Sequence, residues 1–209
     1  MNKKTANSII KHYSTLYENF GYNPASIGWP KGKQNIRFHA ISQIGNLNNS
    51  KILDVGCGFG DLATFLKFRK IKMKYTGVDI NEKFIKIAET VNPDCVFEVR
   101  DIEKRKFKQK FDWIFAIGTT NQSGSYQYIE NLLNEMFRIS KKGISMDFLS
   151  SYVDFKRHGN FHASPERIFK IAKKLSKRVV IRHDYLPFEF CVYIYKNNKI
   201  KKDLSFMDF

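Results

Sequence analysis

The strongest constraint on the fold is a run of nine residues in which a short apolar strand leads into three glycines. Residues 53–61 read Leu-Asp-Val-Gly-Cys-Gly-Phe-Gly-Asp. The pattern predicts a strand over 51–55 and a helix over 61–69, so the glycines form the turn between them. Such a turn lets the backbone approach a nucleotide-like ligand closely. The spacing is G-x-G-x-G rather than the G-x-G-x-x-G of dinucleotide enzymes, which argues against NAD.

Strands and helices alternate after this turn. The predicted strands cover 75–80, 95–100, 111–117 and 143–149, and the predicted helices cover 82–91, 126–140 and 165–175. Alternation of this kind predicts an α/β fold, a Rossmann-like, seven-stranded, mostly parallel sheet with helices on both faces. Two last strands, 178–184 and 188–195, are separated by too few residues for a crossover. They are therefore expected to form an antiparallel C-terminal hairpin.

Residues 1–48 are predicted to form an N-terminal helical cap, or lid, in front of a core at 49–209. Apolar side chains recur at helical spacing over 5–20, and a second helix is predicted over 35–44. The Gly- and Pro-rich stretch 21–33 between them indicates a structured loop. We expect cap and core to form a single structural domain.

Composition limits the classes of protein that this chain can represent. A chain of 209 residues with 43% hydrophobic residues can bury a core, so disorder is excluded. No apolar stretch approaches the roughly 18 residues of a membrane span, and the N-terminus lacks an apolar signal region. The three cysteines are too scattered for a disulfide framework or a zinc site. The expectation is a cytoplasmic protein without a metal.

The formal net charge of +16 raises the question of a nucleic-acid partner. The chain has 27 lysines but 9 arginines, whereas proteins that read nucleic acids rely on the bidentate geometry of arginine. The codon usage of an AT-rich genome favours lysine as well, and we take it as the main source of the excess. Nucleic acid therefore stays a possible but less favoured partner.

Three acids stand at the ends of successive predicted strands. Asp54 precedes the glycines, where it is suited to meet a cationic amino group. Asp79 ends the next strand and is placed to accept hydrogen bonds from two ribose hydroxyls. Asp101 follows the third strand, where an adenine amino group can donate to it.

With these residues the chain resembles a class I S-adenosylmethionine-dependent methyltransferase over about 51–195. The resemblance implies S-adenosylmethionine as cofactor. The cofactor-binding residues that it implies are Asp54, Gly56, Cys57, Gly58, Gly60, Asp79, Ile80, Asp101, Ile102 and Gly118. In that family the positions of Ile80 and Ile102 flank the adenine, and that of Gly118 lies near the methionine moiety.

The acceptor of the methyl group is less well specified. The fourth strand leads into 116–121 without the Asn-Pro-Pro-Tyr-like motif of enzymes that methylate exocyclic amines, and without a Pro-Cys pair. Stretches 28–33 and 182–185 loosely resemble small bacterial methyltransferases of glycan and capsule pathways. That resemblance suggests O-methylation of a small anionic acceptor, namely a sugar, phosphorylated or nucleotide-linked metabolite.

Candidate acceptor residues lie in the cap loop, the loop after the fifth strand and the final hairpin. Those suited to bind the acceptor, either at its anionic group or elsewhere on the molecule, are Lys31, Lys33, Arg37, Arg157 and Tyr185. His158 and His162 are candidate general bases, because a hydroxyl acceptor must lose its proton. Trp29 or Tyr13 is suited to close over the sulfonium, which aromatic faces attract.

Two alternatives remain open, an RNA methyltransferase and a non-catalytic domain that binds the cofactor. The sequence makes no prediction of oligomeric state.

Overall fold

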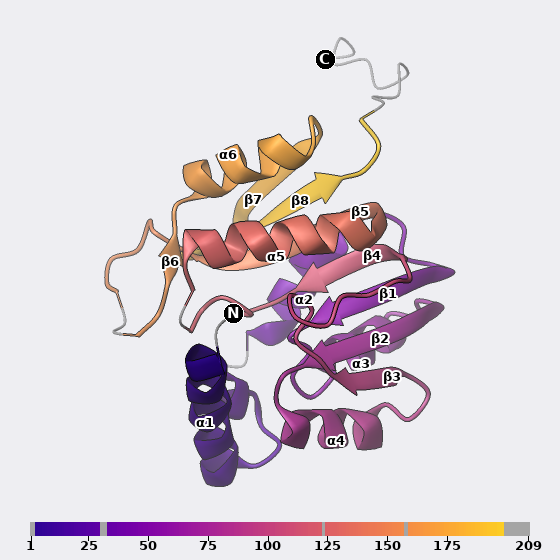
Figure 1. The fold of residues 1–209 in the computed structure, drawn as a ribbon, viewed down its shortest axis with the longest axis vertical. Coiled ribbons are helices and arrows are strands. Elements are labelled where there is room, and N and C mark those ends of the chain that lie inside the picture. Colours follow the sequence, from indigo (N-terminus) through magenta and orange to yellow (C-terminus); the bar gives the residue numbers. More distant parts are fainter. Residues whose placement is uncertain (1–2, 30–32, 123, 157–158, 199–209) are drawn as a thin grey trace.

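One mixed β-sheet forms the centre of the molecule (Figure 1). The computed structural model describes residues 3–29, 33–122, 124–156 and 159–198. Its strands are β1 (Ser50–Val55), β2 (Met73–Asp79), β3 (Val96–Val99), β4 (Phe111–Ala116), β5 (Ser140–Ser150), β6 (His162–Ala163), β7 (Val179–Leu186) and β8 (Glu189–Tyr195).

The strand order in this sheet is β3-β2-β1-β4-β5-β8-β7, and β6 pairs with β5 outside that path. Strands β1 to β5 run parallel, whereas β8 runs antiparallel to both β5 and β7. The predicted Rossmann-like α/β fold with an antiparallel C-terminal hairpin is thus confirmed. Strand β6 has no counterpart among the predicted elements, because two residues are too few to show a periodic pattern.

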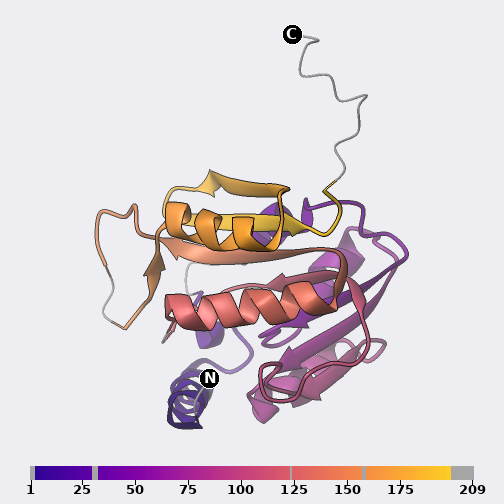
Figure 2. The same ribbon diagram turned by 45° about the horizontal axis from the view of Figure 1, so that its top comes forward.

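Helices cover both faces of the sheet. They are α1 (Lys3–Phe20), α2 (Gln34–Ser42), α3 (Asp61–Phe68), α4 (Glu82–Val91), α5 (Tyr126–Ile139) and α6 (Pro165–Leu175), with a short 3-10 helix η1 (Pro24–Ile27). Apolar residues of α5 and α6 pack together in one core cluster, and those of α2, α3 and α4 in another. Figure 2 shows α5 and α6 on the same side of the sheet.

Helix α1 lies beside the edge at which the parallel strands end, next to α4 (Figure 1). Tyr13 and Tyr17 make edge contacts with the ring of Phe84 in α4. Lys83 Nζ lies 3.0 Å from Glu18 Oε1. Helix α1 therefore forms a wall at the carboxyl ends of the strands. Helix α2, by contrast, contacts β5, β7 and β8, so the division of cap from core at residue 48 stays a prediction.

Local capping explains where several elements begin. Ser164 accepts a hydrogen bond from Arg167 N at 3.1 Å, and Pro165 follows at the first helical position, as predicted for α6. In the predicted loop, Asn23 Oδ1 accepts from Ala25 N at 2.9 Å and starts η1. Gly28 ends η1 with a φ of 85°.

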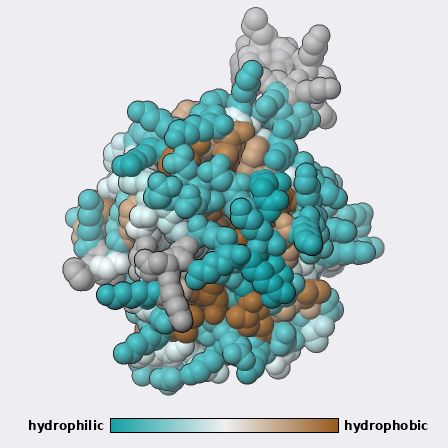
Figure 3. Space-filling model, in the orientation of Figure 1, coloured by the Kyte–Doolittle hydropathy of each residue, from teal (hydrophilic) through white to brown (hydrophobic). Residues whose placement is uncertain are grey.

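The surface in Figure 3 is mostly hydrophilic on the face shown. No helix within the described residues is both long and apolar enough to cross a membrane. In the same part of the chain, no group of three or more His, Cys, Asp or Glu side chains is placed to hold a metal ion.

Candidate active site

The turn between β1 and α3 requires glycine at three positions. Gly56, Gly58 and Gly60 have φ values of 74°, 55° and 77°, in the region that side chains rarely adopt. A Cβ atom on Gly56 would lie 2.9 Å from Thr119 Oγ1, and one on Gly60 would lie 2.9 Å from the Phe97 ring. The turn thus combines positive φ angles with close packing.

The Asp79 carboxylate is held by backbone N–H groups at the carboxyl end of β2. Its Oδ2 accepts from Gly58 N at 3.0 Å, and its Oδ1 accepts from Asn81 N at 2.8 Å. Burial raises the pKa of Asp79, while these backbone donors oppose the rise. The glycine turn and the start of α4 therefore set the orientation of this acid together.

Asp54 lies at the end of β1 and is 3% exposed. Its Oδ2 accepts a hydrogen bond from Tyr75 Oη at 2.5 Å, and its Oδ1 has no hydrogen-bond partner among the described residues. Burial raises the pKa of Asp54 to about 7, and the charges of Asp79 and Asp61 contribute to the rise. A cation beside Oδ1 would favour the ionised carboxylate.

Asp101 follows β3 and has the same incomplete hydrogen bonding. Its Oδ1 accepts from Glu103 N at 3.0 Å. Its Oδ2 is enclosed, accepts no hydrogen bond from the described residues, and lies 3.7 Å from Lys104 Nζ. Ile102 beside it is buried and Ile80 is half-buried.

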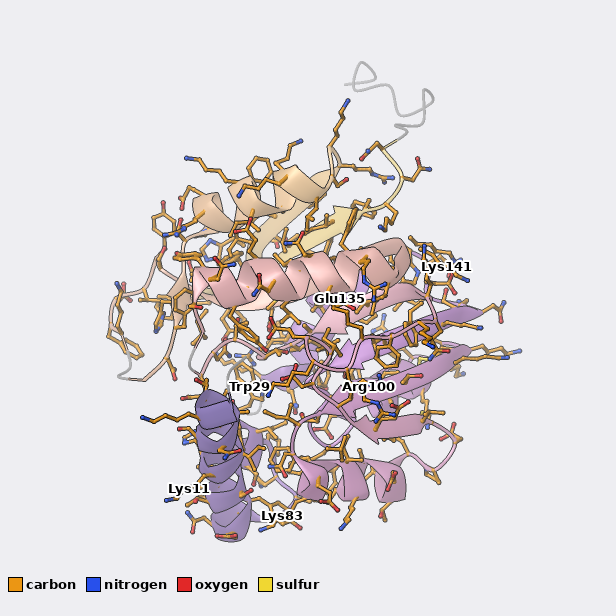
Figure 4. All side chains as sticks on the ribbon, in the orientation of Figure 1. Lys11, Trp29, Lys83, Arg100, Glu135 and Lys141 are labelled. Carbon is orange, nitrogen blue, oxygen red and sulfur yellow. The ribbon has the colours of Figure 1, made fainter. Side chains whose placement is uncertain are left out.

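One pocket brings these residues together beneath α1. It encloses about 1120 Å³ of empty space, part of it open to solvent. The predicted cofactor residues that line it are Asp54, Gly56, Cys57, Gly58, Asp79, Ile80, Asp101, Ile102, Gly118 and Trp29. Gly60 is not in the lining and shapes the start of α3 instead. Figure 4 labels Trp29 beside one end of α1 and Arg100 toward β3, two of the lining residues.

The lining carries charge opposite to that of the chain. Its acids are Asp54, Asp61, Asp79, Asp101 and Glu103, and Arg100 is the one basic residue among the described lining residues. A chain of net charge +16 therefore encloses an acidic pocket. Such a pocket attracts a cation and repels a phosphate backbone.

The cap contributes residues that the glycine motif does not predict. Ile9, Ile10 and Tyr13 of α1 line the pocket, and burial raises the pKa of Tyr13 to about 12. Tyr22 Oη donates to Asp61 Oδ1 at 2.9 Å, and Gln34 Nε2 donates to Asp61 Oδ2 at 3.3 Å. Asp61 thereby ties the cap to the start of α3. The only sequence feature that could have indicated this contact is the position of Asp61 directly after the last glycine of the turn.

A second polar cluster lies where α2 packs against β5, β7 and β8, and it consists of Arg37, Asp147, Tyr185 and Glu189. The Arg37 guanidinium, which is 6% exposed, donates through Nε and Nη2 to both carboxylate oxygens of Glu189. Its Cζ lies 3.7 Å from the centroid of the Trp29 ring. Asp147 Oδ1 accepts from Gly118 N at 2.6 Å. Asp147 carries no sequence signal of its own, because it lies within an apolar strand.

The structure places some of the predicted acceptor residues in this cluster and others away from it. Arg37 and Tyr185 belong to this cluster, whereas Lys33 is exposed at the start of α2. Lys31, Arg157 and His158 lie outside the described residues.

His162 is held at one ring nitrogen. Its Nδ1 lies 2.9 Å from the carbonyl oxygen of Ser150, which can only accept, so Nδ1 carries the proton in this arrangement. Its Nε2 is enclosed and has no partner among the described residues. The register pairs His162 and Glu189 with Leu149 from either side, so the three lie in one row across β6, β5 and β8. Their side chains lie on one face of the sheet, the face that α2 covers.

The chain is similar in sequence to known methyltransferases. Residues 52–143 match the family model described as a methyltransferase domain. This part of the chain, about two fifths of its length, is therefore similar to a methyltransferase domain. A Mycobacterium tuberculosis protein that is named as a methyltransferase is 29% identical over 154 residues, which is 69% of this chain and 92% of that protein.

Two solved structures show how far the methyltransferase fold extends. Magnesium protoporphyrin IX methyltransferase from Synechocystis PCC 6803, with bound S-adenosylhomocysteine, superposes with a TM-score of 0.66 at 13% identity, covering 92% of this chain and 96% of that chain. DhpI in its S-adenosylhomocysteine complex gives a TM-score of 0.71 at 12% identity, covering 92% and 97%. At these identities the likeness shows the fold. Together with the domain match, this fold is the basis for the function proposed below.

Proposed function

We propose that this protein is an S-adenosylmethionine-dependent methyltransferase that methylates an oxygen atom of a small anionic metabolite. The acceptor is a sugar, phosphorylated or nucleotide-linked molecule of the kind used in glycan or capsule biosynthesis. The observation that carries the methyltransferase assignment is the acidic pocket, in which the enclosed oxygens Asp54 Oδ1 and Asp101 Oδ2 have no hydrogen-bond partner among the described residues.

The residues of this pocket fit S-adenosylmethionine. Its amino group is a cation that suits the free oxygen of Asp54, and its adenine amino group is a donor that suits that of Asp101. Asp79, already oriented by two backbone donors, is left to accept from the ribose hydroxyls. Buried carboxylate oxygens without partners are costly, so a ligand that supplies donors is bound in preference to water alone.

When bound, S-adenosylmethionine supplies a methyl group activated by the positive sulfonium. The tasks left to the chain are to align the acceptor and to keep water away. Gly118 and Trp29 line the end of the pocket nearest the second polar cluster. A Cβ on Gly118 would lie 2.8 Å from Trp29 Cζ2, so the ring closes tightly over this backbone.

We assign the general base to His162, with His158 as the other candidate. Because Nδ1 donates to the Ser150 carbonyl oxygen, the lone pair of Nε2 is free to accept a proton from a hydroxyl. His162 lies on β6, directly beyond the end of β4 in the sheet. The nearby acids Asp147 and Glu189 are both engaged by donors of the protein.

The test combines cofactor binding with turnover. Calorimetry with S-adenosylhomocysteine is expected to show binding that Asp101→Ala weakens at least tenfold, since the adenine amino group loses its acceptor. The matched control Asp94→Asn changes an exposed acid outside the pocket and should leave binding unchanged.

Turnover is then measured with methyl-labelled cofactor and a panel of sugar phosphates, sugar nucleotides and RNA. Label in a sugar phosphate or sugar nucleotide supports the proposal. Label in RNA alone contradicts the proposed acceptor. Cofactor binding without label in any acceptor of the panel favours a non-catalytic domain.

A further inference from the structure

The second polar cluster contains hydrogen-bonding capacity that the protein itself does not use. Four elements contribute to it, with Arg37 from α2, Asp147 from β5, Tyr185 from β7 and Glu189 from β8. The side chains of Asp147 and Tyr185 feel the charges of both Arg37 and Glu189, so the four form one electrostatic group.

Two donors in this cluster have no partner among the described residues. Arg37 Nη1 is enclosed and unpaired, although Nε and Nη2 of the same guanidinium each donate to Glu189. Tyr185 Oη is enclosed and unpaired as well. Native proteins pair nearly all buried polar groups, so two free donors in one cluster indicate a ligand.

The free groups are suited to an oxyanion rather than a cation. Arg37 Nη1 can only donate, and a phenol donates readily to an anionic oxygen. Both oxygens of Glu189 accept from Arg37, and the positive charge of Arg37 offsets that of Glu189, so the pair attracts a further cation less than a free carboxylate does. Burial, together with the charge of Glu189, raises the pKa of Asp147 to about 7, so near neutral pH this acid repels an anion only in part.

The cluster also lies next to the end of the pocket that Trp29 and Gly118 line. The Trp29 ring stacks on the Arg37 guanidinium and touches Gly118 with its edge. Gly118 lines the pocket, and its N–H group is held by Asp147. A group bound at Arg37 is therefore separated from the pocket by one aromatic ring and one backbone segment.

We propose that Arg37 Nη1 and Tyr185 Oη form the subsite for the acceptor's anionic group, a carboxylate or a phosphate, beneath the ring of Trp29. This inference rests on the proposed function, because it names the part of the acceptor that the same site holds. The Arg37–Glu189 pair orients the guanidinium, and the anion completes its hydrogen bonding. The hydroxyl to be methylated then extends toward Gly118 and His162.

A structural role and a binding role are separable at Tyr185. Tyr185→Phe removes an oxygen atom that contacts no partner among the described residues, so the thermal midpoint is expected to stay unchanged or rise. Tyr193→Phe is the matched control. The hydroxyl of Tyr193 donates to the carbonyl oxygen of Ala40, so its loss should lower the midpoint without affecting anion binding.

The probes are inorganic phosphate and succinate, titrated separately into protein saturated with S-adenosylhomocysteine and followed by tryptophan fluorescence. Trp29→Phe assigns the signal to the ring above Arg37. We expect saturable binding of at least one anion, weakened at least tenfold by Tyr185→Phe and unchanged in Tyr193→Phe. The anion that binds with the higher affinity identifies the anionic group of the acceptor as a phosphate or a carboxylate.

Equal anion affinity in wild type and Tyr185→Phe overturns the subsite, as does the absence of binding by both anions. Either result leaves the proposed function intact if S-adenosylhomocysteine still binds. A protein that binds anions but no S-adenosylhomocysteine contradicts the proposed function instead.

Discussion

At the scale of single residues, the site contains buried acids, and burial raises their pKa values because it disfavours the charged carboxylate. Asp54 is enclosed at the end of β1, and burial raises its pKa to about 7. Its raised pKa means that the protein binds this proton more tightly than the unfolded chain does, up to about pH 7. A cationic ligand facing Oδ1 must displace that proton, so binding and ionisation are linked.

We therefore expect the affinity for S-adenosylmethionine to rise between pH 5.5 and 7, by up to about tenfold per pH unit, and then to level off. The rise follows because only the ionised form of Asp54 attracts the ammonium group, which itself stays protonated over this range. Calorimetry over a pH series measures it. Asp54→Asn should bind more weakly and lose most of the pH dependence; a variant with the wild-type profile would show that another group is responsible.

His162 is predicted to act in turnover and not in cofactor binding. Replacing it with Ala should lower kcat by about 10²–10⁴-fold while the affinity for S-adenosylhomocysteine stays unchanged, because the imidazole is absent from the pocket lining. Single-turnover kinetics with the identified acceptor measures the effect. His39→Ala is the control, since His39 is exposed and contacts Gln43 of its own segment. Full activity of His162→Ala would transfer the role of base to another group.

At the scale of elements, α1 converts an open strand edge into a pocket. The core supplies the glycine turn and the acids, and α1 supplies apolar and aromatic side chains opposite them. Tyr13 and Tyr17 both pack on Phe84, but Tyr13 also lines the pocket and Tyr17 does not. Comparing variants of the two tyrosines therefore distinguishes attachment of α1 to α4 from direct contact with the ligand.

Tyr13→Ala is expected to weaken S-adenosylmethionine binding about tenfold, because an aromatic face near the sulfonium and part of the wall are lost. Tyr17→Ala removes a similar contact with Phe84 and should lower the unfolding free energy comparably while reducing binding less. Chemical denaturation and calorimetry on the same two proteins compare the effects. Equal losses of affinity would mean that α1 acts only as a whole, through its attachment.

At the scale of the molecule, the described lysines lie outside the pocket lining, although Lys104 Nζ lies 3.7 Å from Asp101 Oδ2. Lysines of three basic runs, which lie after α3, before β4 and at the end of α6 and just beyond it, are exposed, among them Lys70, Lys72, Lys104, Lys108, Lys173 and Lys177. The pocket itself is acidic. Much of the net charge of +16 therefore lies on the solvated surface, and among the described lining residues five acids face the single base Arg100.

This separation predicts that RNA and the cofactor do not compete. RNA bound to the exposed lysines should dissociate steeply with salt, by about 10³-fold or more between 50 and 200 mM if six or more phosphates are contacted. S-adenosylhomocysteine affinity should be unaffected by saturating RNA at the lower salt concentration. Displacement of the cofactor by RNA would place nucleic acid at the pocket and favour the alternative function.

Local sequence patterns were enough to predict the fold class and the gathering of three acids at one edge of the sheet. Parallel strands end at the same edge of a sheet, so Asp54, Asp79 and Asp101 converge whatever the details of packing. The positive φ angles of the turn likewise follow from a local rule, because glycine adopts them at little cost. Short-range rules of this kind can be applied to one sequence alone.

The second polar cluster, where we propose that the acceptor binds, could not be found without the tertiary structure. Arg37 and Glu189 are 152 positions apart and meet because β8 inserts between β5 and β7 while α2 packs across them. Asp147 lies within an apolar strand, and only the register of β4 on β5 brings it to Gly118. Contacts of this range depend on strand order and side-chain packing, which no periodicity in the sequence encodes.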